Sequence, residues 1–248
     1  MLKFSEIDSS ICNIIRSKIE SQLRDCWSLE QAAQKFIDSF YEEFEESLVI
    51  ARMFMSVPYA NLPQFNQKFV TNLVEEKGVA SEMQYDTLVL SLLGTRGEEP
   101  DWNDRRKSKG HVGIPLVSTE FVEATPMLAR LLSDFGLELD WLKKPYDGWI
   151  IDTMGDIAGT FFVPDAKESV DSKKRKIIPM QDFVEAYNVH TVFGIGGRYM
   201  LGSNNIIAAI FFTKENFDKK IARLFQPLIN WFKMITIKLV SQQRIFSN

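Results

Sequence analysis

Histidine and cysteine are scarce in this chain, and their scarcity excludes several kinds of site. The 248 residues include two cysteines, Cys12 and Cys26, and two histidines, His111 and His190. Neither cysteine belongs to a CxxC or cysteine/histidine ligand pattern, so the sequence predicts neither a disulfide framework nor a zinc site. We identify no metal site and no cofactor from the sequence.

The chain also lacks long apolar runs and an excess of positive charge. Its formal net charge of −4 at pH 7 argues against a general nucleic-acid binder, because such proteins present a net basic field. Its first residues do not form a secretory signal, and no apolar run approaches the length needed to cross a bilayer. We therefore expect a cytoplasmic globular protein with neither nucleic acid nor membrane as a partner.

Apolar residues at helical spacing predict helices at both ends of the chain. A stripe of isoleucines predicts a first helix over residues 7–25, and a capping box of Ser28 and Gln31 starts a second helix. Near the other end, an apolar face over residues 217–239 predicts a long helix that Pro227 kinks or divides.

Between these helices, six apolar runs predict strands at residues 49–57, 87–93, 111–117, 158–164, 189–195 and 206–212. The last strands follow one another without the strict strand–helix alternation of a doubly wound parallel sheet. We predict an α+β fold, with a six-stranded antiparallel sheet flanked by helices and with the N-terminal and C-terminal helices packed together. The glycines of "GIGGRYMLG", residues 194–202, lack dinucleotide-binding spacing and predict a hairpin turn.

The most unusual stretch of the sequence is residues 94–116, which holds a tryptophan, one of the two histidines, four acids and five bases. Its basic side chains gather beside Ser108 and the amides around Gly110, a combination that can bind carboxylate or phosphate. In the alternative interpretation, the acids neutralise the bases and the segment is a solvated loop. We select six candidate residues for binding a small anionic ligand: Trp102, Asn103, Arg105, Arg106, Ser108 and His111.

Several stretches of the chain resemble the GAF-like sensory regions found ahead of histidine kinases and diguanylate cyclases in bacteria: LLGTRGEEPDWNDRRKSKGHVGIPL, TPMLARLL, DFVEAYNVHTVFGIGG and IIAAIFFTKE with ARLFQPLINWFK. The resemblance implies a GAF-like fold and a ligand-sensing domain whose terminal helices transmit a signal, with a kinase or cyclase as output partner. It implies no particular ligand. A cyclic-nucleotide signature is missing, and the positions of the cysteines disfavour an attached bilin.

Two other functions remain open at this point. A hydrolase or transferase could use residues 101–111, with Ser108 and His111 as a dyad, although the sequence shows no third group to orient the base. A haem-based gas sensor could use His111 or His190 as the proximal ligand. We favour the sensor or regulatory module, with no catalytic residues of its own.

The apolar terminal helices also predict how the chain is organised. We expect an N-terminal helix over residues 1–27 and a GAF-like sensory domain over residues 28–248 that includes the C-terminal signalling helix. Because the first helix carries an isoleucine-rich stripe and the final helix is apolar around more than one face, we expect the terminal helices to pair across a two-fold axis in a homodimer.

Overall fold

The computed structural model describes residues 2–137, 158–199 and 205–247. Its centre is a six-stranded antiparallel sheet with the strand order β3-β2-β1-β6-β5-β4. The strands are β1 (Leu48–Pro58), β2 (Leu88–Gly97), β3 (Gly113–Pro115), β4 (Ala158–Val163), β5 (Thr191–Arg198) and β6 (Ile206–Thr213). The six strands and their antiparallel pairing confirm the predicted α+β fold.

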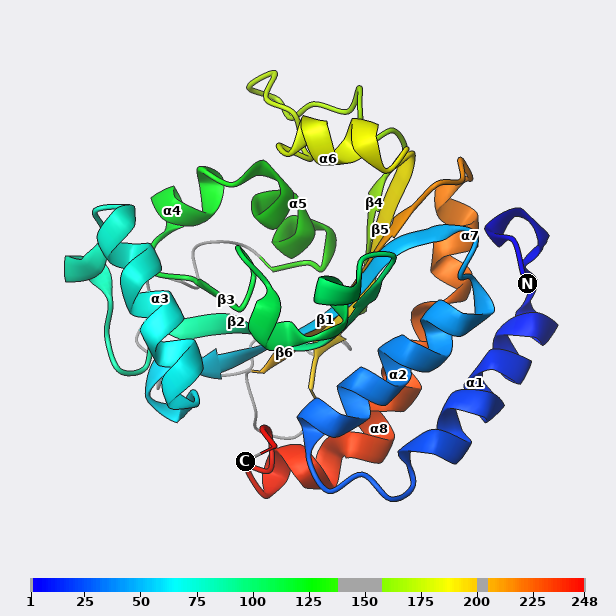
Figure 1. The fold of residues 1–248 in the computed structure, drawn as a ribbon, viewed down its shortest axis with the longest axis horizontal. Helices are drawn as coiled ribbons and strands as arrows, with labels where there is room; N and C mark the ends of the chain where they lie inside the picture. Colours follow the sequence, from blue (N-terminus) through cyan, green and yellow to red (C-terminus); the bar gives the residue numbers. More distant parts are fainter. Residues whose placement is uncertain (1, 138–157, 200–204, 248) are drawn as a thin grey trace.

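Helices cover both faces of the sheet (Figure 1). One face carries α1 (Ser9–Leu23), α2 (Leu29–Glu43), α7 (Lys219–Leu224) and α8 (Gln226–Ser241), and the other carries α4 (Thr119–Glu123), α5 (Pro126–Asp134) and α6 (Gln181–Ala186). The longer α3 (Gln64–Glu76) packs against β3 at one edge.

Alternation along β1 supplies side chains to both hydrophobic cores. Ala51 and Met53 belong to the core under the terminal helices, whereas Phe54 belongs to the core under α4, α5 and α6. This is the period-2 pattern of a strand buried on both faces. Arg52 lies on the same face as Phe54, so β1 directs a cation toward the second layer of helices.

The predicted helix boundaries at the two ends of the chain follow from local chemistry. Ser28 accepts a hydrogen bond from the Gln31 amide at 3.1 Å, and the Gln31 side chain accepts one from the Trp27 amide at 3.0 Å. The C-terminal helical region divides at Phe225, and Pro227 lies in the first turn of α8, where its missing N–H costs least.

The terminal helices share one core, because α1 and α8 both pack against α2. Ile15 and Ile19 of α1 are buried there together with Leu228 and Phe232 of α8. The division into residues 1–27 and residues 28–248 stays a prediction.

The interpretation of the glycines near residue 195 needs a correction. Gly194, Gly196 and Gly197 lie within β5 rather than in a turn, and residues 200–204 of the connection to β6 lie outside the described residues. A Cβ atom on Gly196 would overlap the ring of Phe135, which follows α5. The glycine is therefore required for the close approach of that ring to the sheet.

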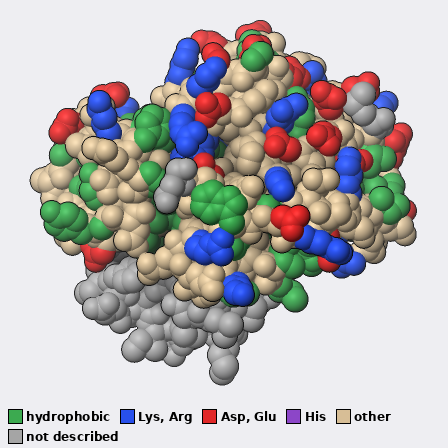
Figure 2. Space-filling view, turned by 60° about the horizontal axis from the view of Figure 1, so that its bottom comes forward, with side chains coloured by type: hydrophobic (Ala, Val, Ile, Leu, Met, Phe, Trp, Pro, Cys, Tyr) green, Lys and Arg blue, Asp and Glu red, His purple; other side chains and the backbone are tan. Residues whose placement is uncertain are grey.

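Basic and acidic side chains are interspersed over the face that Figure 2 shows, with hydrophobic side chains between them. None of the helices in the described ranges is both long enough and apolar enough to cross a membrane.

Candidate ligand-binding site

A cavity of about 720 Å³ lies between the sheet and the second layer of helices. Its floor is formed by side chains of β1, β2 and β6, and its walls come from α5, from the residues around α6 and from the polar segment between β2 and β3. Cavities of this size, mostly apolar and with a few polar groups, are typical of small-molecule sites.

Aromatic side chains form one wall of the cavity. The Trp102 ring lies with its centroid 4.8 Å from the Tyr187 ring and 5.7 Å from the Phe183 ring. Trp102 can lie on the sheet because it lies over Gly97 of β2, where a Cβ atom would come within 2.7 Å of the indole. The Tyr187 hydroxyl donates a hydrogen bond to Glu99 at 3.1 Å. These contacts fix the segment after β2 against α6.

Arg52 supplies a positive charge on the cavity floor. Its Nε atom is buried, and the side chain forms neither an ion pair nor a hydrogen bond with any residue that the structure describes. Burial lowers the pKa of Arg52 to about 10, so the guanidinium is still a cation at neutral pH.

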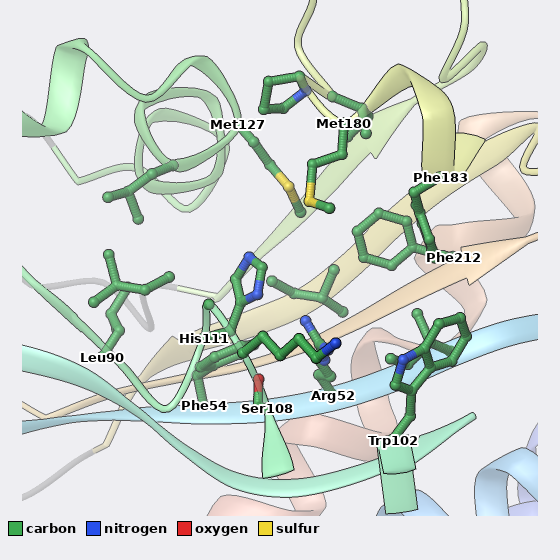
Figure 3. A pocket seen from close by; sticks show the side chains of 18 of the residues that line it. Arg52, Phe54, Leu90, Trp102, Ser108, His111, Met127, Met180, Phe183 and Phe212 are labelled. Atoms are coloured by element: carbon green, nitrogen blue, oxygen red, sulfur yellow. The ribbon is translucent and has the colours of Figure 1, made fainter. Parts of the chain in front are cut away.

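Ser108 and His111 add two polar groups to the same cavity (Figure 3). The Ser108 Oγ atom is buried without a hydrogen-bond partner in the described part of the chain. Burial, followed by the nearby charge of Arg52, lowers the pKa of His111 to about 4, so its imidazole is neutral at physiological pH.

Flexible apolar side chains lie opposite these polar groups. Figure 3 shows Met127 of α5 and Met180, which precedes α6, pointing into the cavity across from His111 and Arg52. Phe54 and Leu90 of the sheet belong to the same lining. The polar groups therefore face an apolar wall across the cavity (Figure 3), and the floor around Arg52 is itself mostly apolar.

The structure brings together three of the six candidate residues, because Trp102, Ser108 and His111 line the cavity. The other three are outside its lining. Asn103 accepts a hydrogen bond from the Gly97 amide at 2.9 Å, and Arg106 is exposed. Binding of a ligand by any of the six stays a prediction.

Arg105 already has a protein anion as its partner. Its Nε and Nη2 atoms donate to the two carboxylate oxygens of Glu30 at 2.7 and 3.0 Å, and Nη1 donates to Asn66 at 3.2 Å. Both charged side chains are almost completely buried. An anionic ligand at Arg105 would have to replace Glu30, whereas one at Arg52 would displace no partner among the described residues.

Sequence reasoning missed Arg52 and the two methionines. The signal for Arg52 was visible, since it is the single charge within the apolar run of residues 49–57. Its alternation with Ile50 and Phe54 marks it as pointing to the face opposite Ala51 and Met53. The methionines had no such signal, because the sequence does not distinguish an apolar side chain in a closed core from one in a cavity wall.

The geometry around Ser108 and the two histidines does not favour an enzyme or a haem-based sensor. The buried Ser108 Oγ has no hydrogen bond, to His111 or to any other described residue, and a neutral His111 with a pKa near 4 is a weak base. His190 is exposed and outside the cavity lining. Across the described ranges, no three histidine, cysteine, aspartate or glutamate side chains gather as a metal site.

No protein-family model matches the chain, and a search among curated proteins found no match. Among solved structures, the chain is similar to the GAF domain of an Acinetobacter phosphoenolpyruvate-protein phosphotransferase, with 10% identity, a TM-score of 0.46, and coverage of 95% of this chain and 98% of that one. It is also similar to a phycoerythrobilin-bound GAF domain of a cyanobacterial phytochrome, with 10% identity, a TM-score of 0.45, and coverage of 96% and 98%. A biliverdin-bound protein in its far-red absorbing dark state gives 8% identity, a TM-score of 0.47, and coverage of 91% and 99%.

Two of these similar structures are described as GAF domains. At these identities and scores, the likeness assigns no ligand, activity or output partner to this chain. In this chain, Cys12 is buried in the core beneath α1 and Cys26 is half-buried after it, and neither lines the cavity.

Proposed function

We propose that the protein is a regulatory module that binds a small molecule in the cavity and transmits a signal through its terminal helices, without a catalytic step of its own. The observation that carries this proposal is the cavity itself, a space of about 720 Å³ in which a few polar groups face an apolar wall. Sites with this composition bind drug-sized ligands and orient them by a few polar contacts.

A route from the cavity to the terminal elements supports the second half of the proposal. The segment that carries Ser108 and His111 also carries Arg105, which is bound to Glu30 in the first turn of α2. Glu30 accepts a hydrogen bond from the Ser247 amide at 2.9 Å, and its own amide donates to Ile245 at 2.8 Å. A ligand that moved this segment would therefore act on α2 and on the C-terminal tail.

The wider setting belongs to the same proposal. The module would work in the cytoplasm of a bacterium, as a homodimer, with a kinase or cyclase on a partner chain as its output. The sequence resemblance to regions ahead of such enzymes supports this setting.

The cavity can be tested with N-phenyl-1-naphthylamine, a neutral probe whose fluorescence rises in apolar surroundings. We expect saturable binding to the wild-type protein. Ile210→Trp fills part of the cavity, because Ile210 lines its floor, and should weaken probe binding at least tenfold. Ile14→Trp makes the same change at an exposed site on α1 and should have no effect. Absence of probe binding to the wild type, or equal binding to both variants, would contradict the proposal.

A further inference from the structure

Arg52 lies on the floor of the cavity, and it forms no ion pair with any acidic side chain in the described part of the chain. On the same face of β1 its neighbours are Ile50 and Phe54, and across the sheet it is paired with Thr95 on β2 and Ile210 on β6. None of these neighbours carries a negative charge. Arg52 is half-buried and its Nε atom is buried, so the guanidinium has lost part of its hydration, and an anion that enters the cavity would compensate for this loss.

The other charged side chains in the described lining are exposed: Glu99, Asp101, Lys107 and Lys109. Lys107 binds Asp101 at 2.9 Å, and Glu99 accepts the hydrogen bond of Tyr187. Among the described residues that line the cavity, Arg52 is therefore the one charged side chain that is not exposed, and its charge matches one negative charge better than the roughly two charges of a phosphate monoester.

The geometry around Arg52 suits a flat anion. A guanidinium presents parallel N–H groups that match the two oxygens of a carboxylate. The free Ser108 hydroxyl can donate one further hydrogen bond, and the neutral His111 ring has one N–H to donate. These donors, like Arg52, have no competing partner within the described residues.

The opposite side of the cavity sets the nature of the rest of the ligand. Met127, Met180 and Phe183 offer apolar contact across from the polar groups (Figure 3). Methionine side chains are flexible and adapt to apolar shapes. Since a carboxylate alone would leave most of a 720 Å³ cavity unfilled, the ligand needs an apolar body.

We infer that the cavity binds an amphipathic monocarboxylate, with its carboxylate on Arg52 and its apolar body against Met127, Met180 and Phe183. This inference rests on the proposed function, because it names the ligand class of the same cavity. It moves the expected anion site from Arg105 and Arg106 to Arg52, a residue of the sheet.

The test compares ligands that share one apolar body and differ in the head group. Decanoate, 1-decanol and decyl phosphate are each titrated against N-phenyl-1-naphthylamine bound to the wild-type protein. We expect decanoate to displace the probe at a concentration at least tenfold lower than either of the others. Arg52→Met should remove the advantage of decanoate and leave displacement by 1-decanol unchanged. Arg16→Met, which removes an exposed arginine of α1 outside the cavity lining, should keep the advantage.

Each outcome decides something. If the wild-type protein binds the probe but shows no preference for decanoate, the inference is wrong and the proposed function still stands. The same holds if the preference for decanoate persists in Arg52→Met. A preference for decyl phosphate would indicate a phosphate ester as the ligand head group, and it would also overturn the inference of a carboxylate. Loss of probe binding by the wild type contradicts the proposed function itself. If Arg52→Met does not fold, the comparison of the three head groups on the wild-type protein still decides the inference.

Discussion

Arg105 and Glu30 form a bidentate ion pair in the interior, and each is the counter-ion of the other. Removal of one partner leaves an uncompensated buried charge, which typically costs about 3–5 kcal/mol. We expect Arg105→Met and Glu30→Gln each to lower the free energy of unfolding by an amount of this order, measured by urea titration. The double variant should lose clearly less than the sum of the two, because it buries no unpaired charge.

Arg106 provides the control for that experiment, since it is the next residue and is exposed. Arg106→Met should change the free energy of unfolding by less than about 0.5 kcal/mol, as surface substitutions usually do. A loss below about 1 kcal/mol for Arg105→Met would mean that water reaches Glu30 and that the pair contributes little.

His111 makes stability depend on pH. Burial and the charge of Arg52 lower the pKa of His111 to about 4 in the folded protein, below its usual value of 6.5. Between these two values the unfolded chain binds the proton and the folded chain does not, so stability falls as pH is lowered from 6.5 toward 4. Six other titratable side chains line the cavity together with His111: Arg52, Lys107, Lys109, Glu99, Asp101 and Tyr187.

The measurement compares the free energy of unfolding at pH 7 and pH 5. His111 should account for a loss of about 2 kcal/mol over that interval, a loss that His111→Gln removes. His190→Gln, at an exposed position outside the cavity, is the matched control. An equal pH dependence in wild type and His111→Gln would show that the imidazole is protonated as easily in the fold as in water.

At the residue scale, the sequence predicted part of the candidate site. The polar segment was recognisable from its composition, and Trp102, Ser108 and His111 do line the cavity. The role of Arg105 was not predictable, because its partner Glu30 lies 75 positions away and only the tertiary fold brings the two together. Arg52 was overlooked because the run around it was read for its hydrophobicity alone.

At the scale of single elements, close packing against Phe135 and β6 restricts which residues β5 can carry at position 196. A Cβ atom on Gly196 would overlap the Phe135 ring and would lie 2.5 Å from the Ile207 carbonyl oxygen. Since the backbone of β6 cannot move aside easily, we expect Gly196→Ala to lower the free energy of unfolding by about 1–3 kcal/mol. Gly110→Ala is the control, because nothing lies within 4 Å of its Cβ position. Equal stability of the two variants would show that the Phe135 ring can move aside without cost.

The sequence predicted some strands and helices but not others. Strands were recognisable because their apolar runs are long and bounded by polar residues, and Pro227 indicated the break between α7 and α8. The short α6 was not predicted, since six residues give too little periodicity, although it forms a wall of the cavity. The glycines of β5 were placed in a turn because the close contact that requires Gly196 comes from Phe135, which is distant in sequence.

For the whole molecule, the sequence predicted the layers but not the cavity between them. The alternation along the strands indicates that both faces of the sheet are covered. The cavity depends on how far α5 and α6 stand from β1 and β6, and this separation results from packing contacts such as Trp102 against Phe183. Apolar periodicity carries no information about that separation.

The homodimer is a prediction about the outer surface of the whole molecule. The helical layer buries Leu228 and Phe232 of α8, but it leaves Met234 69% exposed and Ile235 41% exposed. These two neighbours lie beside the half-buried Trp231 on a helix that reaches both the sheet and α2. Pairing of α8 with its copy would bury this apolar surface and join the C-terminal helices of the two chains.

Light scattering at micromolar concentration tests this pairing. The wild-type protein should show twice the chain mass of 28.6 kDa, and Met234→Lys combined with Ile235→Lys should bring the mass close to that of one chain. Such charges stay solvated in the monomer but would be buried and repel each other across a two-fold axis. Phe65→Lys replaces an exposed hydrophobic residue on α3 and should leave the dimer intact. A single-chain mass for the wild type would instead mean that the exposed residues of α8 are ordinary monomer surface, and transmission would then have to pass through α2 and the C-terminal tail within one chain.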